Sequence, residues 1–574
     1  MKICIGIISY IPDRFTQSQS RKNSIQNLVN KINEIFKGIP IMIVTQNWNK
    51  FDVISNNKVI RYDYDKPLGI TPARKVLREK FLESEYDYMI MLDDDSMIVG
   101  TDGSNYLKEI KLHPDGFGWF SSHLLKLFAI SKYVYSRVDM PDISAENLEG
   151  FEDKIFISMC RIKFPDREFE FDRSKLDEVS YGCASGPPST WWTKDVALHR
   201  SELRKKTNNF IAEYAKKNNS NFTVPVGGID DDNDQRKKVH PIDIVVTYVN
   251  NQEEKWQSEY LKYKRTERNI AENDQTTSEV RFRDPGTFKF WFRGVDKNCS
   301  WVNKVFLIVQ DESQVPKWLD RSNKKLRIVY HDEYIPHDLL PTFNSNVIEM
   351  YIPYISDLSD NYILCNDDTF FINEISRDKL FDGNIPKHAC SSLGGLVKPY
   401  DDFMTTIANN TTFLNEVVGM DIKSNYKHPH LQTPHKKYIE RYLLDKYSEE
   451  IKKCFEKSHF RSTDNITTWM YDEYLKQNDL CIRCNTLYLN SRSVTLKPSL
   501  NYIDLGKREM VCINDTARTE RFEDSCKYLL GFLSSLFPDK CSFEVEESRS
   551  GREGLRNYKL RLQDVDLKRV NSLF

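Results

Sequence analysis

The sequence lacks features that would assign it to several common classes of protein. It has no excess charge of one sign, because 82 Lys and Arg residues nearly balance 84 Asp and Glu residues and the net charge is −2. It has no run of about 18 apolar residues that could span a membrane, and the N-terminal MKICIGIISY becomes polar too soon for a signal peptide. We therefore expect a cytoplasmic protein without a nucleic-acid partner.

Paired cysteines at zinc spacing are missing as well. The twelve cysteines are scattered, and Cys481 and Cys484 form one CxxC with no second pair at the spacing of a zinc site. We expect mostly buried, reduced thiols in a reducing compartment. At 574 residues the chain is too long for one hydrophobic core, so several domains are expected.

The sequence does contain two sets of short apolar segments, which predict an α/β fold with two Rossmann-like units. A helix is expected over residues 72–81 between strands of the first set, and alternation of strand and helix favours mainly parallel sheets. Past residue 400 the pattern is more helical, with candidate helices at 436–446 and 468–476. The expected strands cover residues 2–10, 39–45 and 86–92 in the first set, and 242–249, 304–309, 325–330 and 361–365 in the second.

A composition shift separates the two sets. Residues 224–240 carry Gly-Gly, an acidic run and a basic run, with almost no apolar residue after Ile229. This composition is typical of a linker, although an acidic run can also hold a metal ion. The charged C-terminus is expected to be either a docking helix or a poorly ordered end. The predicted division is a first domain over 1–223, a linker over 224–241, a second domain over 242–540 and a tail over 541–574.

An acidic turn follows the last strand of the first set. Asp93, Asp94 and Asp95 stand where open α/β sheets bind ligands, and their mutual repulsion calls for a cation such as Mg²⁺ or Mn²⁺. With the strand GIISY and the segment LGITPAR (68–74), this turn resembles the GT-A family of glycosyltransferases. The resemblance implies that Asp93 and Asp95 bind the metal and that Arg74 contacts a nucleotide-sugar donor.

A Gly-rich loop at residues 181–186 precedes Trp191 and Trp192. The pair, Trp191 above all, would form either a platform for an acceptor sugar or a packed loop with a buried Trp.

The second half of the chain carries a more specific pattern of ten short blocks. They are 242–256 (IDIVVTYVNNQEEKW), 281–284 (RFRD), 290–293 (FWFR), 301–305 (WVNKV), 315–319 (VPKWL), 340–346 (LPTFNSN), 366–371 (NDDTFF), 430–437 (HLQTPHKK), 459–464 (HFRSTD) and 511–516 (VCINDT). Together they resemble the Stealth family of sugar-1-phosphate transferases, which make phosphodiester-linked capsule polymers in bacteria. The family pattern has Asp or Asn at the position of Asn250, but Trp, Gly and Asp where this sequence has Tyr248, Asn251 and Glu253.

The resemblance and the chemistry of phosphoryl transfer give a set of candidate residues. His430 is the expected general base, with His428 and His435 as neighbours that complicate the choice. Asp367 and Asp368 are expected to hold Mg²⁺ or Mn²⁺ against a diphosphate. The other candidates are the catalytic Arg283, Arg461 and Glu253, and the substrate-binding Arg293, Asn250, Asn344, Asn346, Lys437, Asn514 and Asp515.

For each of these residues a structural role is the alternative, such as capping for Asn344, Asn346 and Asp368 or an ion pair for Arg293. As a whole the sequence predicts a bifunctional enzyme. The first domain would transfer a sugar and release a nucleoside diphosphate. The second would transfer a hexose-1-phosphate, N-acetylhexosamine-1-phosphate being the expected case, from a UDP-sugar with release of UMP.

Two alternatives stay open: a phosphotransferase with a non-catalytic, acceptor-binding first domain, and a carbohydrate-binding scaffold without turnover. The expected partners are a nucleotide sugar and a growing polysaccharide. A lipid-linked acceptor would bring the protein to the inner face of the plasma membrane as a peripheral protein, and a homo-oligomer is a further possibility.

Overall fold

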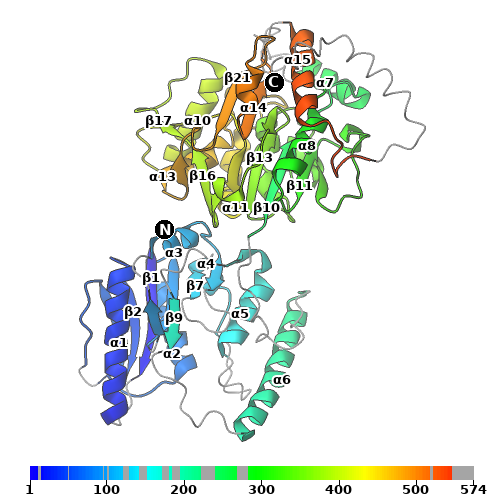
Figure 1. The fold of residues 1–574 in the computed structure, drawn as a ribbon. Helices are drawn as coiled ribbons and strands as arrows, with labels where there is room; N and C mark the ends of the chain where they lie inside the picture. The colour runs from blue at the N-terminus through cyan, green and yellow to red at the C-terminus, as the bar shows by residue number, and fades with distance from the viewer. Residues whose placement is uncertain are drawn as a thin grey trace. The chain divides into compact units, whose positions relative to one another are not determined.

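The computed structural model describes residues 1–10, 15–48, 51–94, 96–99, 103–119, 128–140, 152–170, 180–183, 194–220, 240–267, 282–516 and 521–545. The chain forms two compact units, Met1–Val239 and His240–Phe574 (Figure 1). Their boundary falls at the end of the predicted linker, most of which lies outside the described residues. Within the described ranges, no helix combines the length and apolar character needed to cross a membrane.

The first unit is built on a seven-stranded sheet in the order β3-β2-β1-β4-β7-β6-β8. The first four strands of this order are parallel, and β7 runs antiparallel to β4. The strands are β1 (Ile3–Tyr10), β2 (Ile41–Gln46), β3 (Val59–Tyr64), β4 (Tyr88–Asp93), β6 (Phe117–Trp119), β7 (Phe128–Ser131) and β8 (Glu168–Glu170). A separate pair joins β5 (Ser96–Val99) to β9 (Ser180–Cys183).

Helices cover both faces of this sheet, which explains why its central strands are continuous apolar runs rather than alternating ones. All six residues of β2 are buried. Apolar residues of α1 (Phe15–Ile35) and α3 (Ser104–Lys111) pack on one face. Those of α2 (Ile70–Glu83), α4 (Lys132–Tyr135) and α5 (Glu152–Lys163) pack on the other, and α6 (Lys194–Lys217) packs on α5.

The second unit repeats the same strand order. Its main sheet reads β12-β11-β10-β13-β19, with four parallel strands followed by an antiparallel one. The strands are β10 (Ile242–Thr247), β11 (Val305–Val309), β12 (Leu326–Tyr330), β13 (Asn361–Asn366) and β19 (Thr433–Lys436). Each unit therefore carries an acidic turn after the strand that lies beside its first strand: β4 in one unit and β13 in the other.

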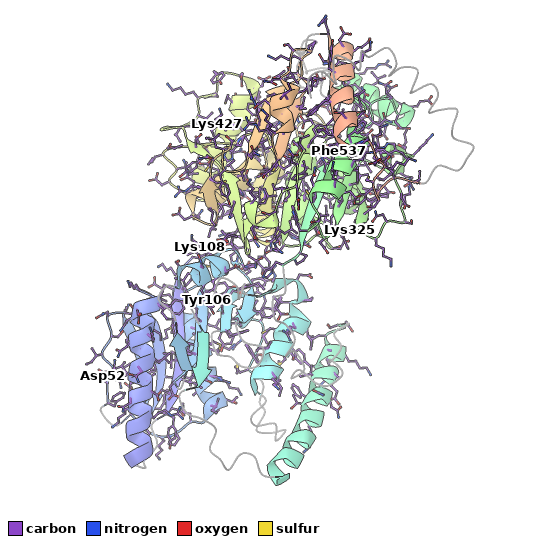
Figure 2. The ribbon with its side chains drawn as sticks, in the orientation of Figure 1. Asp52, Tyr106, Lys108, Lys325, Lys427 and Phe537 are labelled. Carbon is purple, nitrogen blue, oxygen red and sulfur yellow. The ribbon has the colours of Figure 1, made fainter. Side chains whose placement is uncertain are left out.

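Two layers of helices enclose the second sheet. One core joins it to α8 (Phe288–Asn298) and α15 (Phe522–Leu536). The other joins it to α9 (Ser345–Met350), α10 (Asp402–Glu416), α11 (Lys437–Lys446), α12 (Ser448–Lys453) and α13 (Trp469–Gln477). Figure 2 labels Phe537, a buried side chain of this unit, and Lys325 and Lys427, which are exposed.

A three-stranded sheet, β14-β22-β21, holds the acidic turn of the second unit in place. It consists of β14 (Thr369–Phe371), β21 (Ser491–Thr495) and β22 (Met510–Asn514). Thr369 pairs with Cys512, and the amide N–H of Ile513 donates to the carbonyl oxygen of Asp368 at 2.9 Å. On the other side, a Cβ at Gly294 of α8 would lie 2.8 Å from the carbonyl oxygen of Phe371, so only glycine permits this close approach.

Apart from short 3₁₀ helices, seven described elements remain. They are α7 (Glu254–Thr266), α14 (Tyr502–Gly506), β15 (Phe381–Asp382), β16 (Ile385–Ala389), β17 (Ser391–Ser392), β18 (Tyr426–Lys427) and β20 (Ile482–Cys484).

The structure confirms the α/β class, all seven predicted strands and the three predicted helices, with small shifts at their ends. The expected tail from residue 541 needs a correction. Phe543 is fully buried in the core that joins the second sheet to α8 and α15, and Glu544 forms a β-bridge with Leu319. Residues 541–545 are thus part of the second unit, whereas residues 546–574 lie outside the described part of the chain.

Candidate active site

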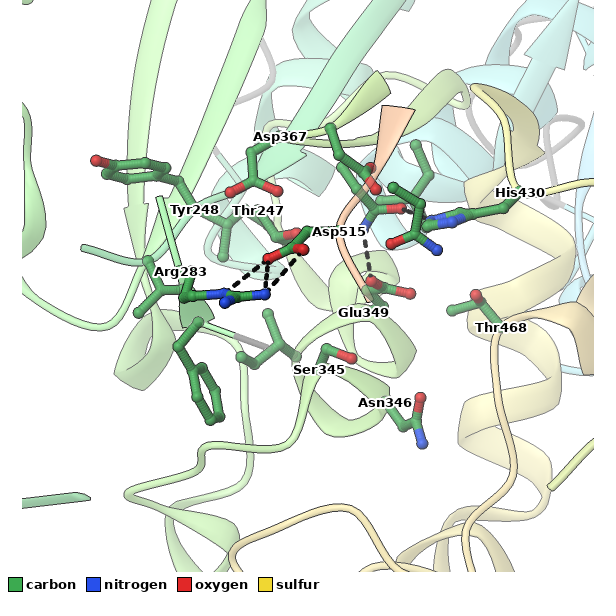
Figure 3. A pocket seen from close by; sticks show the side chains of 18 of the residues that line it. Thr247, Tyr248, Arg283, Ser345, Asn346, Glu349, Asp367, His430, Thr468 and Asp515 are labelled. Atoms are coloured by element: carbon green, nitrogen blue, oxygen red, sulfur yellow. Dashed lines mark hydrogen bonds and ion pairs between the residues drawn. The ribbon is translucent and has the colours of Figure 1, made fainter. Parts of the chain in front are cut away.

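A cavity of about 580 Å³ opens in the second unit at the carboxyl ends of β10 and β13. This is the edge at which open α/β sheets bind their ligands. Side chains from β10, β13, β22 and α9, and from the loops that carry Arg283, His430 and Arg461, line its wall (Figure 3). The cavity is therefore assembled from blocks that lie far apart in the sequence.

Carboxylates crowd one side of the cavity. Burial, together with the like charges of Asp368 and Asp284, holds the pKa of Asp367 well above its ordinary value. One carboxylate oxygen of Asp368, Oδ1, is buried and has no hydrogen-bond partner among the described residues. Repelling carboxylates and an unsatisfied buried oxygen are what a divalent cation with oxygen ligands would relieve, so these residues fit Mg²⁺ or Mn²⁺.

Contacts between three side chains hold the His430 ring and determine which of its two nitrogens carries hydrogen. Asn366 Nδ2 donates to Glu349 Oε1 at 3.0 Å, and Asn366 Oδ1 lies 3.0 Å from His430 Nε2 (Figure 3). Because an amide oxygen only accepts, Nε2 must carry the hydrogen. The Nδ1 atom then keeps its lone pair and is the ring nitrogen able to take a proton.

Glu349, which lines the cavity, is the last residue of this chain of side-chain contacts. Burial raises its pKa, although the nearby Arg461 and the hydrogen bond from Asn366 act in the opposite direction. On the far side of His430, the Sγ of Cys512 lies 3.6 Å from Nδ1 and 3.6 Å from Asp368 Oδ2. His430 thus lies between the amide of Asn366 and the thiol of Cys512.

Two arginines stand at the cavity wall. Arg283 donates from Nε and Nη2 to the two oxygens of Asp515, both at 2.9 Å, and its guanidinium lies 4.0 Å from the ring centroid of Phe522. Arg461 donates to the hydroxyl of Ser345. Fixed guanidinium groups at the wall of a cavity suit the oxygens of a phosphate.

The structure brings most of the predicted second-unit residues together. Those that line the cavity are Arg283, Asn346, Asp367, Asp368, His430, Arg461, Asn514 and Asp515. It also distinguishes His430 from the other two histidines by their partners, although His435 lines the cavity too. His428 Nε2 lies 3.0 Å from Glu473, and His435 Nδ1 lies 2.7 Å from Glu440, so both histidines have partners within the fold.

Other predicted residues have structural partners instead of a place in the cavity wall. Arg293 is the clearest correction, since it forms two hydrogen bonds to Glu544 at 2.6 and 2.8 Å in a largely buried pair. Glu253 accepts from the first amides of α7, and the fully buried Asn344 accepts from the amide of Asn346 and caps α9. Such caps satisfy the free N–H groups of a helix start.

Two further candidates also hold the backbone. Lys437 donates to the carbonyl oxygens of Ser356 and Leu358 at 2.9 and 3.0 Å. Asn250 closes a turn through its Oδ1, which accepts from the amide of Gln252 at 3.0 Å. Their side chains are engaged in local structure rather than placed in the cavity wall.

In the first unit, the described carboxylates at the end of β4 already form ion pairs or hydrogen bonds with other side chains. Asp93 pairs with Arg74 at 3.1 Å, and Asp94 accepts from Ser9 at 2.7 Å and from Arg21 at 2.8 Å. Asp95 and Trp191 lie outside the described residues.

Three side chains that surround His430 have no role in the sequence-based prediction: Asn366 and Glu349, which line the cavity, and the buried Cys512. Asn366 directly precedes the two aspartates, and Cys512 lies in the last matched block. Both residues therefore belong to the matched pattern, but no function was predicted for either. Glu349 gave no signal, because one acidic residue on a short amphipathic helix is ordinary.

Fold and cavity together define a two-unit α/β protein whose second unit has an acidic, arginine-lined site. The family model Stealth protein CR2, conserved region 2, matches residues 281–388. A capsular polysaccharide phosphotransferase WcwK of Streptococcus pneumoniae is 30% identical over 341 residues, which cover 53% of this chain and 99% of that protein. The exopolysaccharide phosphotransferase cps2G of Lactiplantibacillus plantarum is 28% identical over 345 residues, covering 53% and 96% of the two chains. The chain belongs to the Stealth family.

Among solved structures, residues 1–349 of S. aureus TarS match at 13% identity over 39% of this chain and 67% of that one. The TM-score is 0.26, too low for the likeness to bear on fold or function.

Proposed function

We propose that the second unit transfers a sugar-1-phosphate group from a nucleotide sugar to a hydroxyl group of a growing polysaccharide. The observation that carries the proposal is one cavity that joins the Asp367–Asp368 turn, the oriented His430 and the two arginines. The two relatives that match over nearly their whole length are named as polysaccharide phosphotransferases, which supports the same reaction class.

In the proposed reaction the acceptor oxygen attacks the phosphorus that bears the sugar. A new P–O bond forms to the acceptor, the bond from that phosphorus to the bridging oxygen of the diphosphate breaks, and a nucleoside monophosphate leaves. His430 takes the hydroxyl proton at Nδ1, because Nε2 already donates to Asn366. Arg283 and Arg461 hold the negative oxygens of the diphosphate and so favour the charge of the transition state.

Asp367 and Asp368 are the residues that would hold Mg²⁺ or Mn²⁺. When bound, the ion would supply charge neutralisation for the diphosphate. Asn346, Asn514 and Asp515 line the same cavity and are proposed to contact the substrates. UDP-N-acetylglucosamine is the donor that we propose to test first, since family analogy favours it.

The test is an assay of nucleotide products with the full-length protein, a panel of nucleotide sugars, a polysaccharide acceptor and Mg²⁺. The proposal expects nucleoside monophosphate from the wild type and none from Asp368→Asn. Monophosphate release that is unchanged in Asp368→Asn would overturn the site. A complete lack of nucleotide product with every donor would favour the carbohydrate-binding scaffold instead.

For the first unit we propose glycosyl transfer with release of a nucleoside diphosphate. Its support is the strand order shared with the second unit and the position of Asp93 beside Arg74 at the carboxyl end of β4. Asp93→Asn should then remove diphosphate release and leave monophosphate release in place. If wild-type protein releases no diphosphate with any donor, an acceptor-binding role for this unit is the better account.

A further inference from the structure

Two cavity-lining residues and a buried thiol beside them offer a set of donor atoms that the proposed transfer does not use together. Asp368, His430 and Cys512 each offer one ligand atom, and these atoms lie within 4.8 Å of one another. Among the described residues this is the one cluster of His, Cys, Asp and Glu side chains with that geometry. Nitrogen, sulfur and carboxylate oxygen form a mixed set unlike the all-oxygen set of a magnesium site.

The two distances from the sulfur atom to the other ligand atoms fit Zn²⁺. Zn²⁺ binds sulfur at about 2.3 Å and nitrogen or oxygen at about 2.0–2.2 Å in tetrahedral geometry, which puts sulfur about 3.6 Å from each of the other two ligands. Cys512 Sγ lies 3.6 Å from His430 Nδ1 and 3.6 Å from Asp368 Oδ2. Both sulfur distances thus equal those expected between zinc ligands, and all three ligand atoms lie within 4.8 Å of one another.

Two further observations support a ligand set. His430 Nε2 is occupied by Asn366, and this outer contact leaves Nδ1, the atom facing Cys512, available to bind a cation. Asp368 also keeps Oδ1 buried without a partner in the described part of the chain. Three protein ligands leave a fourth position open toward the cavity, as in zinc sites that bind water or a substrate.

We propose that Asp368, His430 and Cys512 form a binding site for a thiophilic divalent cation such as Zn²⁺, and that its occupation inhibits the transfer reaction. Binding replaces the proton of the Cys512 thiol, which passes to solvent, and forms a metal–sulfur bond. The inhibitory part rests on the proposed function, because the ion takes the Nδ1 lone pair that would accept the hydroxyl proton. The ion also binds Asp368, which is one of the two residues proposed to hold Mg²⁺ or Mn²⁺ during the reaction.

The binding test uses metal-free, full-length protein and no nucleotide, so its outcome is independent of the proposed function. Titration with Co²⁺ should produce the near-ultraviolet charge-transfer band of a cobalt–thiolate bond, and Zn²⁺ should abolish the band by displacement. Cys512→Ser should lose the band and bind Zn²⁺ at least about tenfold more weakly. The matched control is Cys454→Ser, which removes a partly buried thiol of the same unit that bonds to Glu450 and should keep the band.

A wild-type protein without the band, or a Cys512→Ser protein that keeps it, overturns the site. If Cys512→Ser does not fold, as judged by circular dichroism, Asp368→Asn removes another ligand instead. This variant should lower the affinity for Zn²⁺ by a similar factor. The inhibitory part is tested by monophosphate release at fixed Mg²⁺ with increasing Zn²⁺. The inhibitory part is supported if the rate falls over the same Zn²⁺ concentrations at which Zn²⁺ displaces Co²⁺ in the binding test. An unchanged or higher rate overturns it.

Discussion

The side chain of Asn366 links His430 to Glu349 through two contacts of 3.0 Å each. The link decides which nitrogen of the imidazole carries hydrogen, and so which one can act as a base. It also anchors the ring to α9 and to the end of β13, the strand that leads into the Asp367–Asp368 turn. Base and proposed metal ligands therefore share one rigid support.

Replacement of His430 should remove the base. We expect His430→Ala to lower kcat for monophosphate release by about 10²–10⁴-fold, with a much smaller change in the donor KM. The exposed His337 lies outside the cavity lining, so His337→Ala is the matched control and should retain its rate. A His430→Ala enzyme with wild-type kcat would contradict the assignment.

Replacement of Asn366 should leave the imidazole present but misoriented. We expect Asn366→Ala to lower kcat by about 10²-fold while the donor KM stays near its wild-type value. Nitrogen-15 NMR of the His430 ring distinguishes this positioning role from general damage, because the wild type should show hydrogen on Nε2 and the variant a mixture of tautomers. The same tautomer in both proteins would refute the role of Asn366.

The crowded carboxylate of Asp367 should cost stability as pH rises. Its pKa in the folded protein is raised above the unfolded value of about 4, so the free energy of unfolding falls as pH increases above that value. Asp367→Asn removes this penalty and should raise Tm near pH 7 by about 2–4 °C, or about 1 kcal/mol, with no difference below about pH 4. Calorimetry over this pH range measures both.

Addition of Mg²⁺ supplies the control for this experiment. The ion should raise the Tm of the wild type at neutral pH and leave Asp367→Asn little changed. A variant whose Tm is equal to or below that of the metal-free wild type at every pH would show that the carboxylate is not under strain.

The pair of Arg293 and Glu544 should act on stability and not on substrate binding. Loss of one partner leaves a largely buried charge, so Arg293→Met should destabilise the second unit by about 3 kcal/mol. Its kcat/KM at a temperature where the variant is folded should match the wild type. Weaker donor binding with unchanged Tm would restore the sequence-based prediction that Arg293 contacts substrate.

The sequence predicted seven strands of the two main sheets because their signal is local. Residues 242–249 and 361–365 are apolar runs between polar segments, and such runs are expected in sheets buried on both faces. The antiparallel β19 was missed because its four residues, TPHK, contain three polar side chains and a proline. Only its pairing with β13 makes it a strand.

The site was predictable where a motif fixed both residue type and position, as at His430 and Asp368. The prediction failed where it depended on the direction in which a side chain points. The FWFR block correctly marked a helix, yet which way Arg293 points on α8 depends on Glu544, 251 residues away. Glu349 likewise becomes part of the site only because Asn366, 17 residues later, folds against it.

The fate of the phosphorus atom that bears the sugar is the most direct test of the account. A nucleotide sugar labelled with ³²P at that position is incubated with the full-length protein, Mg²⁺ and acceptor, and polymer is separated from nucleotides. The account predicts that the label enters the polymer and that unlabelled nucleoside monophosphate is released. Label found only in nucleoside diphosphate, with an unlabelled polymer, would contradict it.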